Sequence, residues 1–283
     1  MMFSKLTVLI AHGFYHTPAP YKPFVDALGR QGIDAFVPQL ATSDLSKLNV
    51  GNVNQPDFDR EPPRGGYPQG TEDAAIFGKV LRDLIEKDSR EVLIVAHSAG
   101  GWVATQSAVR DLQLQERRNK GLKGGIVGIM YYGAFVIPKG ESISSFFQPK
   151  DGSITTPPWL TFHKYGRDGL GTLVEPEKYL LNGVEAKEAT KWAKGLTATP
   201  VVRTVLTNDP YYSVPLAYVV LEGDLTLPKA YQEGMIAGQE AKSGPFKKKY
   251  YSPAGHSAHL TWTDGLVSAV KDFTSGLQSR GAC

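Results

Sequence analysis

The chain has 283 residues, which suits one large domain with a sizeable hydrophobic core. Its 31 basic and 28 acidic side chains give a formal net charge of +3, so nothing indicates a polyanionic partner such as a nucleic acid. The single cysteine, Cys283, excludes an intramolecular disulfide and a thiolate metal cluster. No apolar run is long enough to cross a bilayer, and we expect a cytoplasmic protein.

Short apolar runs alternate with helical patterns over the first half of the chain. Such alternation is typical of βαβ units and predicts an α/β fold with a mostly parallel sheet. The run at 91–96 is too apolar to have a solvent face, which indicates a strand in the middle of that sheet. In chain order, the expected elements are a strand at 6–11, a helix at 20–30, a strand at 34–38, a helix from 71, the strand at 91–96, a helix at 99–114 and a strand at 125–136.

Two stretches interrupt this rhythm. Residues 41–70 are rich in Pro, Gly, Asn and Asp, and a loop of this length is often functional, so we place it at the mouth of a pocket. Residues 141–213 are rich in prolines and aromatics, which we interpret as a helical cap inserted between core segments 1–140 and 214–283. After the cap, strands are expected at 216–221 and 248–252, with helices at 228–241 and from 263.

The motif that indicates chemistry is VLIVAHSAGGW, from Val92 to Trp102. Ser98 stands between a buried strand and a helix, where a sharp turn would expose its hydroxyl beyond the carboxyl edge of the sheet. That turn requires small residues two positions away on either side, and Ala96 and Gly100 meet the requirement. The N–H of Ala99, at the helix start, would be one donor to an oxyanion.

A second oxyanion donor is expected in the loop after the first strand, which reads His12-Gly13-Phe14. Gly13 would let the backbone approach closely, so that the N–H of Phe14 faces the substrate. A simple strand-to-helix turn is the alternative. His12 and His16 are expected to shape this loop rather than to transfer protons.

The base and the acid are expected after the last two strands. His256 precedes the final helix and is the expected base, while His259, within the helix start, is its competitor. His97 would point away from the nucleophile and have a structural role. Asp224 follows the penultimate strand as the expected acid, and Glu222 is the alternative. The order serine, acid, histidine is that of a doubly wound hydrolase sheet.

With these motifs the chain resembles the α/β-hydrolase superfamily, and more narrowly its single-domain branch of plant methyl esterases, hydroxynitrile lyases and microbial hydrolases. The resemblance implies Ser98 as nucleophile, Asp224 as acid and His256 as base, with oxyanion amides from Phe14 and Ala99. The matching segments are VLIAHGFYHTPAPY, TEDAAIFGKVLRDLIE, VLIVAHSAGGW, MYYGAFVIPKGES, YVVLEGDLTLPKAYQEGM and SPAGHSAHL.

Two departures favour hydrolysis over lyase chemistry. The hydroxynitrile lyases carry a threonine where Gly13 stands, and a lysine directly after the catalytic histidine, where this chain has Ser257. A site that handles cyanide needs that positive charge. The resemblance therefore implies a hydrolase.

The expected reaction is hydrolysis of a small hydrophobic ester or lactone through an acyl-enzyme, with no metal and no cofactor. The expected substrate contacts are His12, Gly13, Trp159, Phe162 and His163, although the cap aromatics could equally form the cap's own core, and His163 could be exposed.

Two other functions stay open. The same site could perform C–C bond cleavage or cyclisation of a polyketide-like secondary metabolite, and the scaffold could serve as a ligand receptor. The oligomeric state is open as well, with a homodimer as one alternative.

Overall fold

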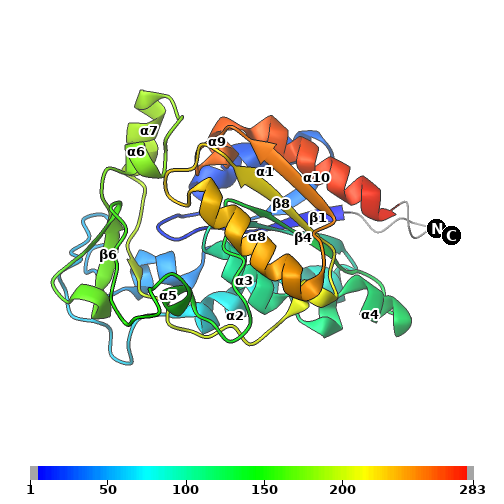
Figure 1. Cartoon of the computed structure of the whole chain (residues 1–283), viewed down its shortest axis with the longest axis horizontal. Helices are drawn as coiled ribbons and strands as arrows, with labels where there is room; N and C mark the ends of the chain where they lie inside the picture. The colour runs from blue at the N-terminus through cyan, green and yellow to red at the C-terminus, as the bar shows by residue number, and fades with distance from the viewer. Residues whose placement is uncertain (1–5, 279–283) are drawn as a thin grey trace.

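A six-stranded sheet forms the centre of the molecule, seen in a computed structural model that describes residues 6–278 (Figure 1). Cys283 lies outside the described residues. All neighbouring strands are parallel, in the order β2-β1-β3-β4-β8-β9. The strands are β1 (Leu6–Ala11), β2 (Asp34–Phe36), β3 (Glu91–His97), β4 (Gly125–Tyr132), β8 (Leu216–Leu221) and β9 (Lys248–Ser252).

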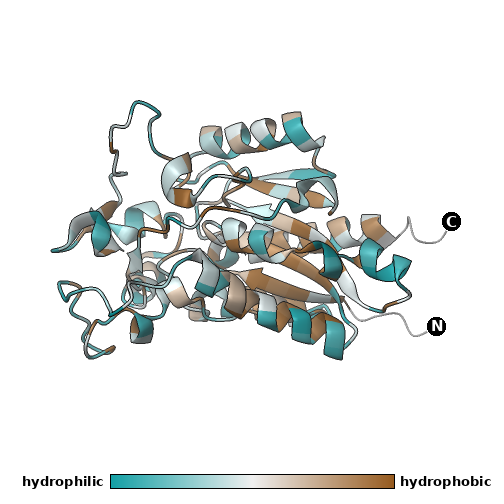
Figure 2. Ribbon diagram, turned by 90° about the horizontal axis from the view of Figure 1, so that it is seen from below, coloured by the Kyte–Doolittle hydropathy of each residue, from teal (hydrophilic) through white to brown (hydrophobic). Residues whose placement is uncertain are grey.

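Helices cover both faces of this sheet, because its central strands are apolar on both sides. In β3, Leu93 and Val95 face one layer, which contains α1 (Lys22–Arg30) and α10 (Thr263–Gln278). Ile94 and Ala96 face the opposite layer. Figure 2 shows the hydrophobic strands enclosed between the helices. The helices of the opposite layer are α2 (Gly70–Arg82), α3 (Gly100–Ser107) and α8 (Lys229–Ser243).

The segment between β4 and β8 stands at one end of the sheet, and we call its residues 141–213 the cap segment (Figure 1). It differs from the helical cap that we expected, because part of it forms a three-stranded antiparallel sheet. Its helices are short, since prolines recur throughout. Its elements are α5 (Ile143–Phe146), β5 (Leu160–Phe162), η6 (Gly166–Asp168), β6 (Leu170–Leu173), α6 (Pro176–Tyr179), α7 (Ala186–Ala193), β7 (Thr199–Pro200) and η7 (Pro210–Tyr212).

Residues 41–70 form an extended but anchored loop. Leu48 and Val50 are buried against Leu170 and Ala198 of the cap segment. At the base of the loop, Asp73 of α2 accepts hydrogen bonds from the Thr42 N–H and hydroxyl at 2.9 and 2.7 Å. The loop contains two 3-10 turns, η2 (Ala41–Ser43) and η3 (Leu45–Lys47).

The expected strands at 6–11, 216–221 and 248–252 are confirmed to the residue, because each is a short apolar or β-prone run with clear ends. The strand expected at 125–136 ends at Tyr132, and the helix expected to reach 114 ends at Ser107. Within residues 6–278, no helix is long and apolar enough to cross a membrane. The remaining short helices are η1 (Ala19–Tyr21), η4 (Asp83–Lys87), η5 (Arg110–Leu112), α4 (Leu114–Asn119) and α9 (Ala258–Thr261).

Candidate active site

Four parallel strands end at the same edge of the sheet, and each is followed by one of the expected site residues. Phe14 follows β1, Ser98 follows β3, Asp224 follows β8 and His256 follows β9. The chain leaves β1 toward β2 on one side and reaches β3 on the other, so Ser98 and Phe14 flank the topological switch point. Ligands of open α/β sheets bind at such a point.

Ser98 has a left-handed backbone conformation, with φ at 52°, which is unfavourable for a side chain other than glycine. Its carbonyl accepts the N–H groups of Gly101 and Phe135 at 3.0 and 2.9 Å, and these bonds hold the turn. A Cβ on Gly100 would collide with the Ala11 carbonyl, so the helix after Ser98 packs directly on β1. The turn therefore fixes Ser98 at the strand end.

Asp224 and His256 form a buried pair. The Asp224 Oδ2 and the His256 Nδ1 are 2.7 Å apart, and both side chains are fully buried. The other carboxylate oxygen accepts the N–H groups of Thr226 and Leu227 at 2.8 and 2.7 Å. Because Asp224 accepts at Nδ1, a neutral His256 has its Nε2 free as a base.

The Nε2 of His256 is buried and has no hydrogen-bond partner within residues 6–278. The same part of the chain shows no hydrogen bond between Ser98 and His256. In unliganded hydrolases this bond is often long and tightens only when substrate binds.

The two alternative groups lie elsewhere. The Glu222 carboxylate accepts from Lys229 Nζ at 2.7 Å and is 42% exposed, so it points away from His256. The His259 ring is buried and stacks on Tyr21 at 4.2 Å between centroids. Asp224 therefore accompanies His256, and His259 belongs to the packing behind the site.

The backbone amides of Phe14 and Ala99 donate no hydrogen bond in the described part of the chain. Gly13 brings the first of them to Ser98, since a Cβ at Gly13 would lie 2.8 Å from the Cβ of Ser98. Phe14 and Ser98 line the same cavity. Both amides are thus free to donate to an oxyanion.

A chain of hydrogen bonds joins the loop after β1 to the loop that carries His256. The Gly13 N–H donates to the Tyr21 hydroxyl at 3.0 Å, and Tyr21 lies 2.6 Å from His97 Nδ1. The His97 Nε2 is 3.0 Å from the His256 carbonyl, which can only accept. His97 must therefore carry its proton on Nε2, and Tyr21 must donate to Nδ1.

Five of the six histidines are buried, namely His12, His16, His97, His256 and His259. Desolvation lowers the pKa of His97 well below its ordinary value, and the pKa of His259 likewise. Burial also lowers the pKa of His12 to about 4 and that of His16 to about 3. These rings are neutral at physiological pH.

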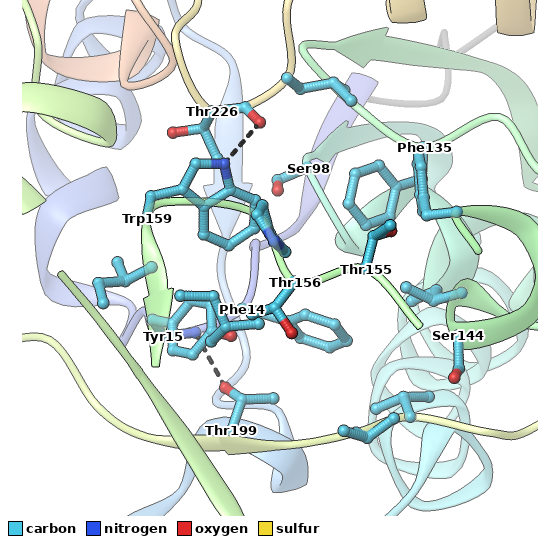
Figure 3. Close-up of a pocket in the computed structure, with 18 of the residues that line it drawn as sticks. Phe14, Tyr15, Ser98, Phe135, Ser144, Thr155, Thr156, Trp159, Thr199 and Thr226 are labelled. Carbon is cyan, nitrogen blue, oxygen red and sulfur yellow. Dashed lines mark hydrogen bonds between the residues drawn. The ribbon is translucent and has the colours of Figure 1, made fainter. Parts of the chain in front are cut away.

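The cavity above Ser98 has a volume of about 540 Å³ and a mostly apolar lining (Figure 3). Trp159 and Phe162 of the cap segment line it, together with Phe14 and Phe135. The Trp159 indole donates to the Thr226 carbonyl at 3.1 Å, which connects the cap segment to the loop after β8. Trp159 and Phe162 are therefore placed to contact a ligand.

Three residues that the sequence led us to expect as substrate contacts do not line this cavity. His12 is buried behind the loop, where its ring nitrogens bond to the Gly13 carbonyl and the Leu40 N–H. Gly13 is buried beneath Ser98. The His163 Nε2 bonds to the Thr172 hydroxyl of β6 at 2.9 Å, and neither residue lines the cavity.

Sequence reasoning did not find three residues of the site. Tyr21 belongs to the hydrogen-bond chain described above, and Arg167 lines the cavity. Asn182 of the cap segment accepts the His256 N–H at 3.4 Å and donates to the Gly223 carbonyl at 2.8 Å, so it connects the acid and histidine loops. No local motif marks these residues, because each acts through contacts distant in sequence.

Comparison with known proteins decides the family. The model of the alpha/beta hydrolase family matches residues 8–269, which is most of the chain. The chain belongs to the α/β hydrolase family. The family match confirms the expected resemblance, the α/β fold class and the prediction of a hydrolase enzyme.

Individual relatives of this α/β hydrolase are distant. An "Alpha/beta hydrolase nvfD" of Aspergillus novofumigatus is 25% identical over 234 residues, which cover 81% of this chain and 82% of that protein. The methylesterase MES16 from Arabidopsis has a TM-score of 0.64 at 17% identity, with 95% of this chain and 99% of that chain covered. Polyneuridine aldehyde esterase has a TM-score of 0.68 at 15% identity, with the same coverage. The two solved structures show a shared fold.

Proposed function

We propose that this α/β hydrolase cleaves a small hydrophobic ester or lactone with a Ser98–His256–Asp224 triad. The observation that carries the proposal is the buried 2.7 Å contact between Asp224 and His256, at the strand ends beside the left-handed turn of Ser98. Membership of the family and the esterases among its structural relatives support ester hydrolysis in general.

In the proposed mechanism, the Nε2 of His256 takes the hydroxyl proton of Ser98 as the oxygen attacks the ester carbonyl. Asp224 holds the ring in the required tautomer and stabilises the imidazolium. The amides of Phe14 and Ala99 stabilise the oxyanion, each by roughly 3 kcal/mol if other oxyanion donors are a guide. His256 then protonates the leaving alcohol, and water releases the acid from the acyl-enzyme.

The proposal is tested by the release of nitrophenolate from p-nitrophenyl butyrate. Ser98→Ala and His256→Ala are each expected to lower kcat by more than about a thousandfold, as in other serine hydrolases. Glu222→Gln is the matched control for Asp224→Asn, because its carboxylate pairs with Lys229 at the surface. We expect Asp224→Asn to lower kcat by roughly ten-thousandfold and Glu222→Gln to leave it unchanged.

Turnover that survives Ser98→Ala would contradict the acyl-enzyme and would direct attention to C–C bond cleavage on the same fold. Tight binding of a ligand with no turnover of any ester would instead favour the receptor function.

A further inference from the structure

The cavity above Ser98 contains one charged side chain among its described lining residues. This is Arg167, in the η6 turn of the cap segment, and every other lining side chain is apolar or neutral. An arginine carries its positive charge at neutral pH. A guanidinium beside an apolar cavity is costly unless it finds a partner for its donors.

Arg167 has no acidic partner within residues 6–278. Its Nη2 donates to the Ser144 hydroxyl at 3.1 Å, which satisfies one of five N–H donors. The adjacent carboxylate, Asp168, is bound instead by Arg203 at 2.9 Å. Arg203 also donates to the Arg167 carbonyl at 2.9 Å, so the turn is held, while the Ser144 hydroxyl is the one hydrogen-bond partner of the Arg167 guanidinium in the described part of the chain.

The position of Ser144 shows where the Arg167 guanidinium lies in the cavity. Ser144 lies on α5 and lines the cavity as well, and Figure 3 shows it well apart from Ser98, beyond Phe135 and Thr155. A group bound by Arg167 and Ser144 would therefore lie away from the bond that Ser98 attacks. Arg167 also borders a second pocket of about 260 Å³, which is formed with residues of the 41–70 loop and with Asp168 and Arg203.

We propose that Arg167, with the Ser144 hydroxyl, binds a carboxylate of the substrate. This inference rests on the proposed ester hydrolysis and narrows it: the substrate has an apolar body, an ester or lactone near Ser98 and a free carboxylate at the far end. The planar guanidinium fits a carboxylate through two parallel hydrogen bonds, which neutral cavity residues cannot replace. The apolar lining between the two ends binds the connecting part of the ligand.

The test compares p-nitrophenyl esters of hexanoic, octanoic and decanoic acid with the hemiesters of adipic, suberic and sebacic acid, which add a terminal carboxylate at the same chain lengths. The wild-type protein is expected to prefer at least one hemiester in kcat/KM. Arg167→Gln is expected to lower the ratio of hemiester to plain ester by roughly ten- to a hundredfold, the usual effect of losing a charged hydrogen bond. The preference should also fall as salt is added, because Arg167 is only half-buried.

Lys164→Gln is the matched control, since it removes one exposed positive charge from the same turn region without touching the cavity lining. It is expected to leave both rates and their ratio unchanged. If the wild-type protein prefers the plain esters, or if Arg167→Gln leaves the ratio unchanged, the inference is overturned while ester hydrolysis stands.

A binding measurement separates this inference from the proposed function if no ester is turned over. The p-nitroanilide of suberic acid resists hydrolysis, and its affinity can be measured by isothermal titration calorimetry. Binding that weakens by about tenfold or more in Arg167→Gln, but not in Lys164→Gln, would support the carboxylate site on its own. Equal affinities in all three proteins would overturn it.

Discussion

The Tyr21 hydroxyl lies 2.6 Å from Nδ1 of His97, and this contact joins the loop of Phe14 to the loop of His256. Tyr21 receives the Gly13 N–H on one side, and His97 donates to the His256 carbonyl on the other. All four residues are buried, so water cannot replace a missing partner. We infer that Tyr21 and His97 are positioning residues for the candidate site.

Tyr21→Phe removes the hydroxyl and leaves the Gly13 N–H and the His97 Nδ1 buried without partners. We expect a loss of about 1–3 kcal/mol in the free energy of unfolding, measured by urea denaturation, because unsatisfied buried groups cost this much. We also expect kcat to fall more than KM changes, since the loops that carry the Phe14 amide and His256 are displaced while the part of the lining from the cap segment is kept.

Tyr212→Phe is the control, because Tyr212 is 64% exposed. It should alter neither stability nor rate. A Tyr21→Phe protein with the stability and kcat of the wild type would show that the hydrogen-bond chain has no positioning role.

Gly13→Ala tests the close approach of the oxyanion loop to Ser98. The new Cβ would lie 2.8 Å from the Ser98 Cβ, so the loop must shift and carry the Phe14 amide with it. We expect kcat for ester hydrolysis to fall by roughly a hundredfold or more, the usual cost of losing one oxyanion donor.

Gly29→Ala provides the comparison, because it lies on α1 with open space around its Cβ position. This change should leave activity intact and stabilise the helix by about 0.5–1 kcal/mol. If Gly13→Ala retains wild-type kcat, the loop after β1 does not hold the oxyanion.

The buried histidines predict that acid destabilises the protein. Burial lowers the pKa of His12 to about 4 and that of His16 to about 3, and it lowers those of His97 and His259 well below the ordinary value. Below about pH 6.5 the unfolded chain therefore takes up protons that the folded protein refuses. Each such group costs roughly 1.4 kcal/mol of stability per pH unit until its folded pKa is reached.

The contribution of Asp73 to stability changes with pH in the opposite direction. Burial raises its pKa to about 6, so the folded state binds its proton more readily than the unfolded chain does. Between its unfolded pKa of 3.8 and its folded pKa of about 6, protonation of Asp73 stabilises the folded state by about as much per pH unit as one buried histidine destabilises it. Urea midpoints from about pH 7.5 to about pH 4.5 would measure the net slope. His259→Gln should flatten that slope, because it removes one of the buried rings whose pKa is lowered; a slope equal to that of the wild-type protein would refute the assignment.

Much of the fold was predictable because it depends on local pattern. The apolar runs of β1 and β8 and the β-prone run of β9 have sharp ends in the sequence, and parallel strands bring those ends to one edge. That is why Ser98, Asp224 and His256 could be proposed together before their distances were known.

The remaining features depend on contacts between distant segments. The cap sheet forms because Leu160–Phe162 pairs with Leu170–Leu173, a pairing that prolines and aromatics did not indicate. The Tyr21–His97 contact spans 76 positions, and within residues 6–278 the lack of an acidic partner for Arg167 is visible only once Asp168 is seen to bind Arg203. Packing decides these relationships, so periodicity could not predict them.

The central claim is that Ser98 is a nucleophile activated by His256, and it is tested most directly by covalent labelling. The protein is treated with a fluorophosphonate probe, and the adduct is located by mass spectrometry of its peptides. We predict a single adduct on Ser98 that is lost in Ser98→Ala and strongly slowed in His256→Ala. An unlabelled wild-type protein, or an adduct on another serine with Ser98 unmodified, would contradict the claim.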